Sequence, residues 1–288
     1  MKFVTYINQQ TPEVGIIVNE KIYPVNKIDN SIPSQMSDIL KDWDANMVKA
    51  KEVEAQILSG NHEALSSSLE GSNLLAPVPN PTSCRDGYAF RQHVAAARRN
   101  RNVPMIAEFD QYPIFYFTNH NAIMGPGEIP CMPDHFQQLD FELEVAIVIG
   151  KEGRNIKAKD ADAYIAGFTI MNDLSARKLQ MEEMLLNLGP AKGKDFSTVI
   201  GPWLVTPDEL STYLVPAKQG HVGNNYNLSM KCWVNDKLVS EGNVKDMDWT
   251  FAEIIERCSY GVTIFPGDVI GSGTVGTGCF LELNGTGK

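Results

Sequence analysis

The sequence predicts an α+β protein with a β-rich body and a small N-terminal α/β unit. Two observations predict this class. Past residue 200, most periodic segments are strand-like, and only TFAEIIERC has helical spacing. Before residue 75, three strand-like pieces precede one long helical pattern. Because 288 residues suffice for a large domain plus a smaller one, we expect a small domain over 1–75 and a larger one over 76–288.

The N-terminal elements follow from periodicity and composition. KFVTYI, VGIIVN and KIYPVN are short and rich in β-branched residues, as strands are. MSDILKDWDANMVKAKEVEAQIL has apolar residues at helical spacing. LLAPVPNPTS (74–83) carries three prolines and predicts a linker or an extended entry strand.

The body alternates strands and helices before becoming mostly β. SCRDGYAFRQHVAAARR predicts a loop that runs into a helix, and QYPIFYFT predicts a strand. LDFELEVAIVIG (139–150) and AYIAGFTIMND predict two buried strands, and LSARKLQMEEMLLNLG predicts a helix. Four more strands are expected, at GPWLVT, NLSMKCWVN, GVTIFPGDVI and GCFLELNG.

Charge and cysteine content exclude several classes of partner. The net charge of −10 creates a field that repels phosphate backbones and anionic lipid, so we expect neither nucleic acid nor membrane as a partner. The N-terminus MKFVTYINQQ lacks the apolar core of a secretory signal. The five cysteines are scattered and form no CxxC motif. These features predict a cytoplasmic location.

Two glutamates stand at the entrance of a buried strand. Glu142 and Glu144 are two residues apart, so on a strand they point to the same face. Burying two like charges is costly unless something neutralises them. A hydrated strand end would need no partner, whereas burial would favour a divalent cation such as Mg²⁺, Ca²⁺ or Mn²⁺, which prefers several oxygen ligands.

Two further acids fit a cation site. Asp173 follows the apolar strand AGFTIM, and Asp86 precedes His93 by seven residues. The spacing of Asp173, Arg177 and Gln180 (i, i+4, i+7) predicts one helical face able to bind a metal and an anionic oxyacid. Asp173 as a simple helix cap, with a surface ion pair, is the alternative.

A histidine, an isolated acid and a lysine are the other candidates. His93 could act as a general base if a carboxylate oriented it, and Glu282 in CFLELNG is the candidate. Lys194 lies in a glycine-flanked loop, where it could stabilise developing negative charge. Each also has a plain structural interpretation, as a satisfied histidine or a surface lysine. GSGTVGTG lacks the phosphate-loop pattern and predicts close backbone approach to a small ligand.

Five motifs together resemble the fumarylacetoacetate hydrolase family over roughly residues 74–288. They are DGYAFRQH, LDFELE, MNDLSARKLQ, GKDFSTVIGPW and PGDVIGSGTVGTGCFLEL, in this order. The resemblance implies a mixed-sheet β-sandwich roll with a small N-terminal domain, usually as a homodimer. It also implies that Mg²⁺ or Ca²⁺, with Mn²⁺ as a further option, is held by Asp86, Glu142, Glu144 and Asp173.

The resemblance implies a role for each remaining candidate. His93, oriented by Glu282, would activate water. Substrate contact is implied for Tyr88 and Thr274, and proximity to the metal for Thr198. The developing oxyanion would be bound and polarised by Arg177, Gln180 and Lys194, with Gln180 also contacting substrate and Lys194 also near the metal.

The expected activity is metal-dependent hydrolysis of a C–C bond in a 2,4-dioxo acid. Fumarylacetoacetate or a related acylpyruvate would be the small-molecule substrate, in the degradation of tyrosine and other aromatic compounds. Met184 falls where the fumarylacetoacetase pattern has a substrate-binding tyrosine, which leaves the acyl substituent open. One alternative is decarboxylation, hydration or isomerisation of a 2-oxo acid such as oxaloacetate. Another is a non-catalytic metal-binding protein.

Overall fold

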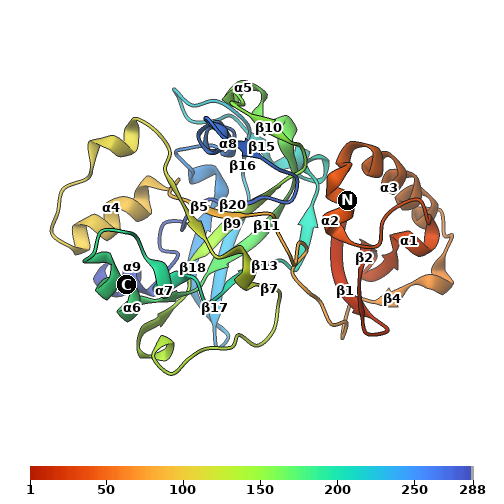
Figure 1. Cartoon of the computed structure of the whole chain (residues 1–288), viewed down its shortest axis with the longest axis horizontal. Helices are drawn as coiled ribbons and strands as arrows, with labels where there is room; N and C mark the ends of the chain where they lie inside the picture. The colour runs from red at the N-terminus through yellow and green to blue at the C-terminus, as the bar shows by residue number, and fades with distance from the viewer. Residues whose placement is uncertain (287–288) are drawn as a thin grey trace.

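A single twelve-stranded sheet organises the chain. The computed structural model describes residues 1–286 (Figure 1). The main path of the sheet runs through β4 (Ser67–Ser68), β3 (Lys21–Pro24), β2 (Thr11–Val18), β1 (Lys2–Asn8), β14 (Trp203–Val205), β11 (Ile165–Asp173), β9 (Leu143–Ile149), β20 (Val269–Gly271), β5 (Cys84–Gly87) and β6 (Phe115–Thr118). Two short strands lie off this path, β13 (Thr198–Ile200) and β7 (Ile123–Met124).

The sheet is mixed, as predicted. β20 pairs with β5 in parallel and β13 with β7 in parallel, whereas the remaining pairs in this sheet are antiparallel. Residues 1–286 also form four two-stranded ribbons: β10 (Gly153–Arg154) with β19 (Thr263–Ile264), β8 (Leu139–Asp140) with β12 (Ser175–Ala176), β15 (Leu214–Val215) with β16 (Asn225–Tyr226), and β17 (Ser229–Val234) with β18 (Lys237–Asn243).

Helices surround the sheet. The α-helices are α1 (Val25–Ile28), α2 (Met36–Lys41), α3 (Trp43–Leu58), α4 (Arg91–Asn100), α5 (Ala158–Ala161), α6 (Arg177–Met184), α7 (Ala191–Lys194), α8 (Phe251–Ser259) and α9 (Phe280–Thr286). Short 3-10 helices are η1 (Glu63–Leu65), η2 (Ala107–Asp110), η3 (His120–Ala122), η4 (His135–Gln138), η5 (Asp162–Tyr164), η6 (Pro207–Tyr213) and η7 (Val244–Asp246).

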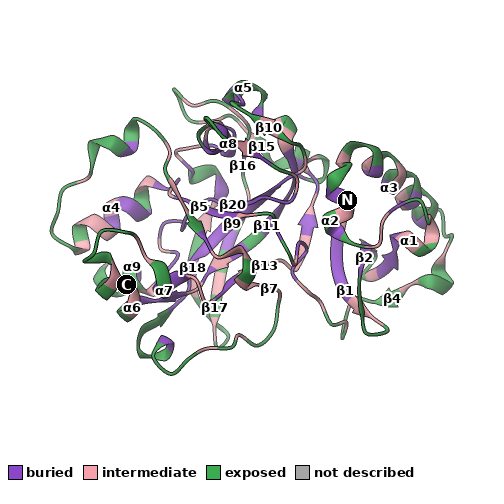
Figure 2. Ribbon diagram, viewed as in Figure 1, coloured by how far each residue is buried: buried purple, intermediate pink, exposed green. Residues whose placement is uncertain are grey.

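The central strand β9 is buried on both faces, which explains its continuous apolar sequence. Val145, Ile147 and Ile149 join one core cluster, while Ala146 and Val148 join another. Successive side chains of a strand point to opposite faces, so one strand supplies both clusters. Figure 2 shows the central strands mostly buried, while the helices around them carry buried as well as exposed residues.

The N-terminal residues continue the main sheet. β1 pairs with β14 through Phe3 opposite Leu204, and the second core cluster contains side chains from both sides of residue 75. In Figure 1 this unit lies at one end of the long axis. The division at residue 75 stays a prediction. Within residues 1–286, no helix has the length and apolar character needed to cross a bilayer.

Three local predictions were wrong. GCFLELNG is not a strand, because Phe280–Thr286 form helix α9, which also means that a helix follows the glycine-rich loop. A segment of seven residues is too short to be assigned to helix or strand by periodicity alone. The segment before α4 is a strand, β5, instead of a loop. LDFELE is interrupted, since β8 ends at Asp140 and β9 begins at Leu143, leaving Glu142 between them.

Candidate active site

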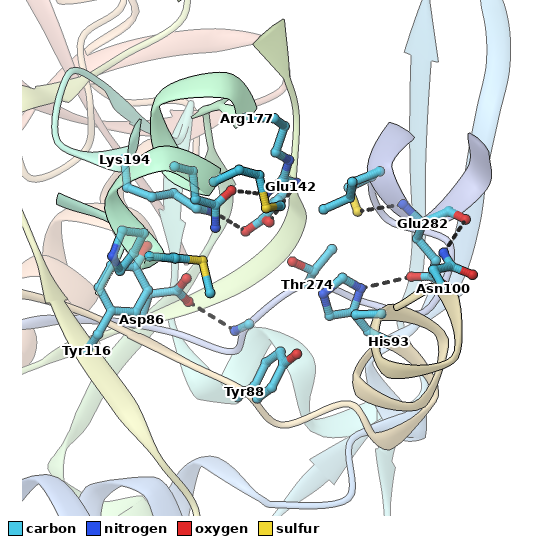
Figure 3. A pocket seen from close by; sticks show the side chains of 18 of the residues that line it. Asp86, Tyr88, His93, Asn100, Tyr116, Glu142, Arg177, Lys194, Thr274 and Glu282 are labelled. Atoms are coloured by element: carbon cyan, nitrogen blue, oxygen red, sulfur yellow. Dashed lines mark hydrogen bonds and ion pairs between the residues drawn. The ribbon is translucent and has the colours of Figure 1, made fainter. Parts of the chain in front are cut away.

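Most of the predicted site residues line one cavity of about 870 Å³. Its wall includes Asp86, Tyr88, His93, Glu142, Arg177, Gln180, Lys194, Thr274 and Glu282. Figure 3 shows Asp86, Glu142 and Lys194 on one side, with His93 and Glu282 across from them. Three predicted residues are fully buried behind this surface: Glu144, Asp173 and Thr198.

Neighbouring strands bring the acids together. Asp86, Glu142 and Glu144 each place one carboxylate oxygen within 4.8 Å of the others. Asp173, at the end of β11, joins them through a shared lysine, described below. We call these four residues the carboxylate cluster. All four are buried, so the hydrated strand end considered for the glutamates is not what the structure has.

The glycine-rich loop supports two of these carboxylates. The backbone N–H of Gly273 donates to Asp86 Oδ1 and to Glu144 Oε2, both at 3.1 Å. Gly271 lies directly against the same groups. A Cβ at Gly271 would come within 2.8 Å of Asp86 Oδ1 and 2.9 Å of Glu144 Oε2. The backbone of the glycine-rich loop was predicted to approach a small ligand closely, and here it approaches the carboxylates of Asp86 and Glu144.

Lys194 lies between two of the acids. Its Nζ is 2.6 Å from Glu142 Oε2 and 2.7 Å from Asp173 Oδ2, and the side chain is buried. The hydroxyl of Tyr116 donates to the same oxygen of Asp173 at 2.5 Å. Thr198 stands opposite Asp173 in the β11–β13 register. Lys194 is thus part of the site, and a surface lysine is excluded.

The prediction that Asp173, Arg177 and Gln180 share one face of a helix was wrong for Asp173. Asp173 ends strand β11, while Arg177 begins α6, so they do not share a helix. Arg177 and Gln180 do share the first turn of α6, and Arg177 donates to Gln180 Oε1 at 2.9 Å. Asp173 caps no helix either, because the N-cap of α6 is Ala176.

Protonation follows the position of the cations. Burial and the charge of Asp173 raise the pKa of Asp86 to about 8. Burial and the charge of Asp86 raise the pKa of Glu144 well above its usual range. For Glu142, burial acts in the same direction, but the charges of Lys194 and Arg177 outweigh it and lower the pKa. The end of the cluster formed by Asp86 and Glu144 therefore has too little positive charge nearby to keep both carboxylates ionised.

That deficit fits a divalent cation. Glu144 Oε1 and Asp173 Oδ1 are buried and have no hydrogen-bond partner within the described residues. Unpartnered buried carboxylate oxygens are costly. Clustered carboxylate oxygens are the donor set that Mg²⁺, Ca²⁺ and Mn²⁺ prefer. The residues present therefore suit the predicted metal.

An aspartate links the two sides of the cavity. Asp140 is buried and accepts hydrogen bonds from the backbone N–H groups of Phe280 (2.7 Å) and Leu281 (3.0 Å), at the start of α9. The same carboxylate accepts from Arg177 Nε at 2.8 Å. Arg177 in turn lies 2.8 Å from Glu142 Oε1. The helix that carries Glu282 is thereby connected to the carboxylate cluster.

The opposite wall holds the histidine. His93 on α4 and Glu282 on α9 are buried, with 2.8 Å between His93 Nδ1 and Glu282 Oε2. The ring of Tyr88 meets the imidazole edge-on, with 5.8 Å between centroids. The expectation that Glu282 would orient His93 agrees with this geometry, although Glu282 lies on a helix.

Several residues of the site were not anticipated. Asp140 stands two residues before Glu142, and the D-x-E-x-E alternation was an available signal for it. Tyr116 pairs with Asp86 across β5 and β6, which no local pattern reveals. Cys279 is buried in the cavity wall, and burial and the charge of Glu142 raise its pKa to about 12, so its thiol stays neutral.

The chain belongs to the fumarylacetoacetate hydrolase family. The family model described as fumarylacetoacetate (FAA) hydrolase C-terminal matches residues 82–286. The human protein named oxaloacetate tautomerase FAHD2A, mitochondrial, is 33% identical over 286 residues, covering 96% of this chain and 79% of its own length. The Xenopus laevis protein named oxaloacetate tautomerase fahd2, mitochondrial, is 33% identical over 283 residues, covering 94% and 78%.

Solved structures share the fold. Maleylpyruvate hydrolase from Sphingobium sp. SYK-6, in complex with manganese(II) ion and pyruvate, matches with a TM-score of 0.70 at 22% identity, covering 97% of this chain and 90% of that one. Fumarylacetoacetate hydrolase from Exiguobacterium antarcticum matches with a TM-score of 0.68 at 22% identity, covering 97% and 88%. The predicted family fold is confirmed.

Proposed function

We propose that this enzyme catalyses the keto–enol tautomerisation of oxaloacetate or a closely related 2-oxo dicarboxylate. The observation that carries the proposal is a single cavity with a cation-binding carboxylate cluster on one side and a histidine–glutamate pair on the other. The first group suits an enolate, and the second suits proton transfer. The relatives named as oxaloacetate tautomerases, similar over nearly the whole chain, support this substrate.

The carboxylate cluster would hold the metal. Asp86, Glu142 and Glu144 supply convergent oxygens, and Asp173 supplies a further oxygen beside Lys194. When bound, a divalent cation supplies Lewis-acid stabilisation of negative charge on the substrate oxygen. Mg²⁺ and Mn²⁺ are the proposed ions, with Ca²⁺ as the other candidate.

His93 would move the proton at carbon. Because Nδ1 faces Glu282, Nε2 remains for the substrate. In the enol-to-keto direction, the enol gives its O–H proton to solvent and becomes the enolate. The imidazolium of His93 then gives its proton to C3, where the C2–C3 π electrons form the new C–H bond as C2–O⁻ becomes C2=O, and His93 regains a proton from solvent. Glu282 stabilises the imidazolium before transfer. The reverse direction removes the C3 proton onto Nε2.

Basic and hydroxyl groups would orient the dicarboxylate. Arg177 and Lys194 are buried cations in the cavity wall, and both also pair with Glu142. Tyr88, Thr274 and Gln180 add polar groups to the same wall. A substrate with two carboxylates gains charge-assisted hydrogen bonds from this arrangement.

Hydrolysis of an acylpyruvate is the second candidate. The specific observation in its favour is the His93–Glu282 pair, which also suits activation of water. The relatives' names give this reaction, and the predicted role in tyrosine and aromatic degradation, no support. The names of these relatives also include the word mitochondrial, which differs from the cytoplasmic location predicted for this chain. The homodimer stays a prediction.

A parallel assay separates the candidates. The ultraviolet absorbance of the enol is followed for oxaloacetate and for a panel of acylpyruvates, with Mg²⁺ and with EDTA. We expect Mg²⁺-dependent acceleration of oxaloacetate ketonisation, with no pyruvate released. Hydrolysis would be favoured if an acylpyruvate released pyruvate and a carboxylic acid with a higher kcat/KM than that of oxaloacetate ketonisation. Tight Mg²⁺ binding without either reaction would identify a non-catalytic metal-binding protein.

A further inference from the structure

A second group of metal-ligating side chains lies apart from the carboxylate cluster. His93, Cys279 and Glu282 each place one ligand atom within 4.8 Å of the others, and all three are buried. All three line the cavity, so an ion can reach them through it. Cys279 has no part in the proposed function.

The two groups differ in ligand chemistry. The carboxylate cluster offers only oxygen ligands, which hard cations prefer. A thiolate with an imidazole and one carboxylate is a set that Zn²⁺ prefers, and three protein ligands leave a fourth position for water. Among the described residues, no other cysteine belongs to such a group: Cys84, Cys131, Cys232 and Cys258 stand outside both.

We propose that His93, Cys279 and Glu282 form a zinc-selective site whose occupation inhibits the enzyme. Zn²⁺ replaces the proton between His93 Nδ1 and Glu282 Oε2, which lie 2.8 Å apart. Binding also releases the proton of the Cys279 thiol to solvent, because the thiolate is the ligand form. An imidazole that ligates zinc through Nδ1 has lost Glu282 as its partner and no longer forms the imidazolium needed at carbon. The inhibition rests on the proposed function, whereas the site itself does not.

Cobalt reports thiolate ligation directly. The full chain is first saturated with Mg²⁺, which fills the carboxylate cluster, and is then titrated with Co²⁺. We expect one near-ultraviolet thiolate-to-cobalt charge-transfer band in the wild type, displaced by Zn²⁺. The band should be absent in Cys279→Ser and in Cys279→Ala, and should remain in the matched control Cys232→Ser, whose thiol lies outside the cavity wall.

Loss of a ligand should also weaken zinc binding. Glu282→Gln should lower Zn²⁺ affinity, measured by competition with Co²⁺, by roughly 100-fold, since even outer partners of metal ligands contribute 10–100-fold. A wild-type protein without the band, or an equal band in Cys279→Ser, would overturn the proposal.

The activity measurement separates the site from the proposed function. With Mg²⁺ in excess, Zn²⁺ should inhibit the wild type and a chelator should reverse the effect. With each protein's activity expressed relative to its own zinc-free activity, Cys279→Ser should require at least roughly tenfold more Zn²⁺ than the wild type for half-inhibition. Equal inhibition of both would assign zinc to the carboxylate cluster and contradict the second site. A band without inhibition would keep the zinc site and contradict the role of His93.

Discussion

The two walls of the cavity hold their charged groups by different means. On the sheet wall, Asp86, Glu144 and Asp173 belong to strands β5, β9 and β11, whose positions are fixed by register with neighbouring strands. On the helix wall, His93 and Glu282 belong to α4 and α9, which pack against each other. The sheet wall is tied to both cores, while the helix wall depends on packing between two helices and on Asp140.

This difference assigns separate tasks to the walls. A cluster of like charges needs rigid support, because relaxation would carry the carboxylates apart. A proton-transfer pair needs a short hydrogen bond and access to the substrate. Substitutions on the sheet wall should therefore alter metal affinity, and substitutions on the helix wall should alter kcat.

The largest loss of activity is expected from a substitution on the helix wall. Replacing His93 with alanine removes the proposed proton carrier, so kcat for oxaloacetate ketonisation should fall by about 10²–10⁴-fold. Mg²⁺ affinity, measured by calorimetry, should stay unchanged because the carboxylate cluster is intact. The matched control is His221→Ala, which removes the histidine of a second His–Glu pair, 3.1 Å from Glu253 and outside the cavity wall. Wild-type turnover in His93→Ala would contradict the assignment.

Breaking the sheet wall should change metal binding. In Gly271→Ala, the new Cβ would come within 2.9 Å of Glu144 Oε2 and 2.7 Å of Met171 Sδ, so a carboxylate must move. We expect Mg²⁺ affinity to fall by roughly 10–100-fold. Calorimetric titration measures this. Unchanged affinity would show that the glycine does not set the carboxylate positions.

Asp140 tests the connection between the walls. Asp140→Asn keeps the size of the side chain but removes the charge that pairs with Arg177 at 2.8 Å. Because the start of α9 is held by the same carboxylate, Glu282 should lose its alignment, and kcat should fall roughly tenfold. The pH profile of kcat should shift, which a purely structural loss would not produce. Asp110→Asn, at an exposed ion pair with Arg91, is the control.

The pH dependence of stability should reveal the charge deficit of the sheet wall. In the metal-free protein, the pKa of Asp86 is raised from 3.8 to about 8, so between these values the folded chain binds more protons than the unfolded chain. Stability must then fall as pH rises through this window. Thermal midpoints in EDTA should drop by at least about 2–4 °C from pH 5 to pH 8, a change of about 1 kcal/mol.

Saturating Mg²⁺ should reduce that drop. The cation supplies the positive charge that the ionised acids lack. The thermal midpoint in Mg²⁺ should therefore exceed the midpoint in EDTA by more at pH 8 than at pH 5. Identical profiles with Mg²⁺ and with EDTA would contradict a cation site among these residues.

The sequence predicted the charged residues of both walls but missed two residues that contact them, Asp140 and Tyr116. The acids on buried strands were recognisable because a charge inside an apolar run demands a partner, as at Glu144 and Asp173. Asp140 stood in the same alternation but was overlooked. Tyr116 depends on strand pairing between distant segments, so no local signal could identify it.

The helix that carries Glu282 shows the limit of local patterns. FLELNGT is too short for periodicity to decide between helix and strand, and its helical state coincides with two hydrogen bonds from its first N–H groups to distant Asp140. The pairing of Glu282 with His93 was predicted despite that error, because it rested on the resemblance and on side-chain chemistry.

Metal stoichiometry tests the account most directly. Calorimetric titration with Mn²⁺ should find one tightly bound ion per chain in the wild type when Mg²⁺ is absent. Glu144→Gln, which removes a buried carboxylate without changing its size, should show no comparable binding, while the exposed control Glu241→Gln should behave as wild type. A wild-type chain that takes up no divalent ion, or a Glu144→Gln chain that binds it equally well, would contradict the account.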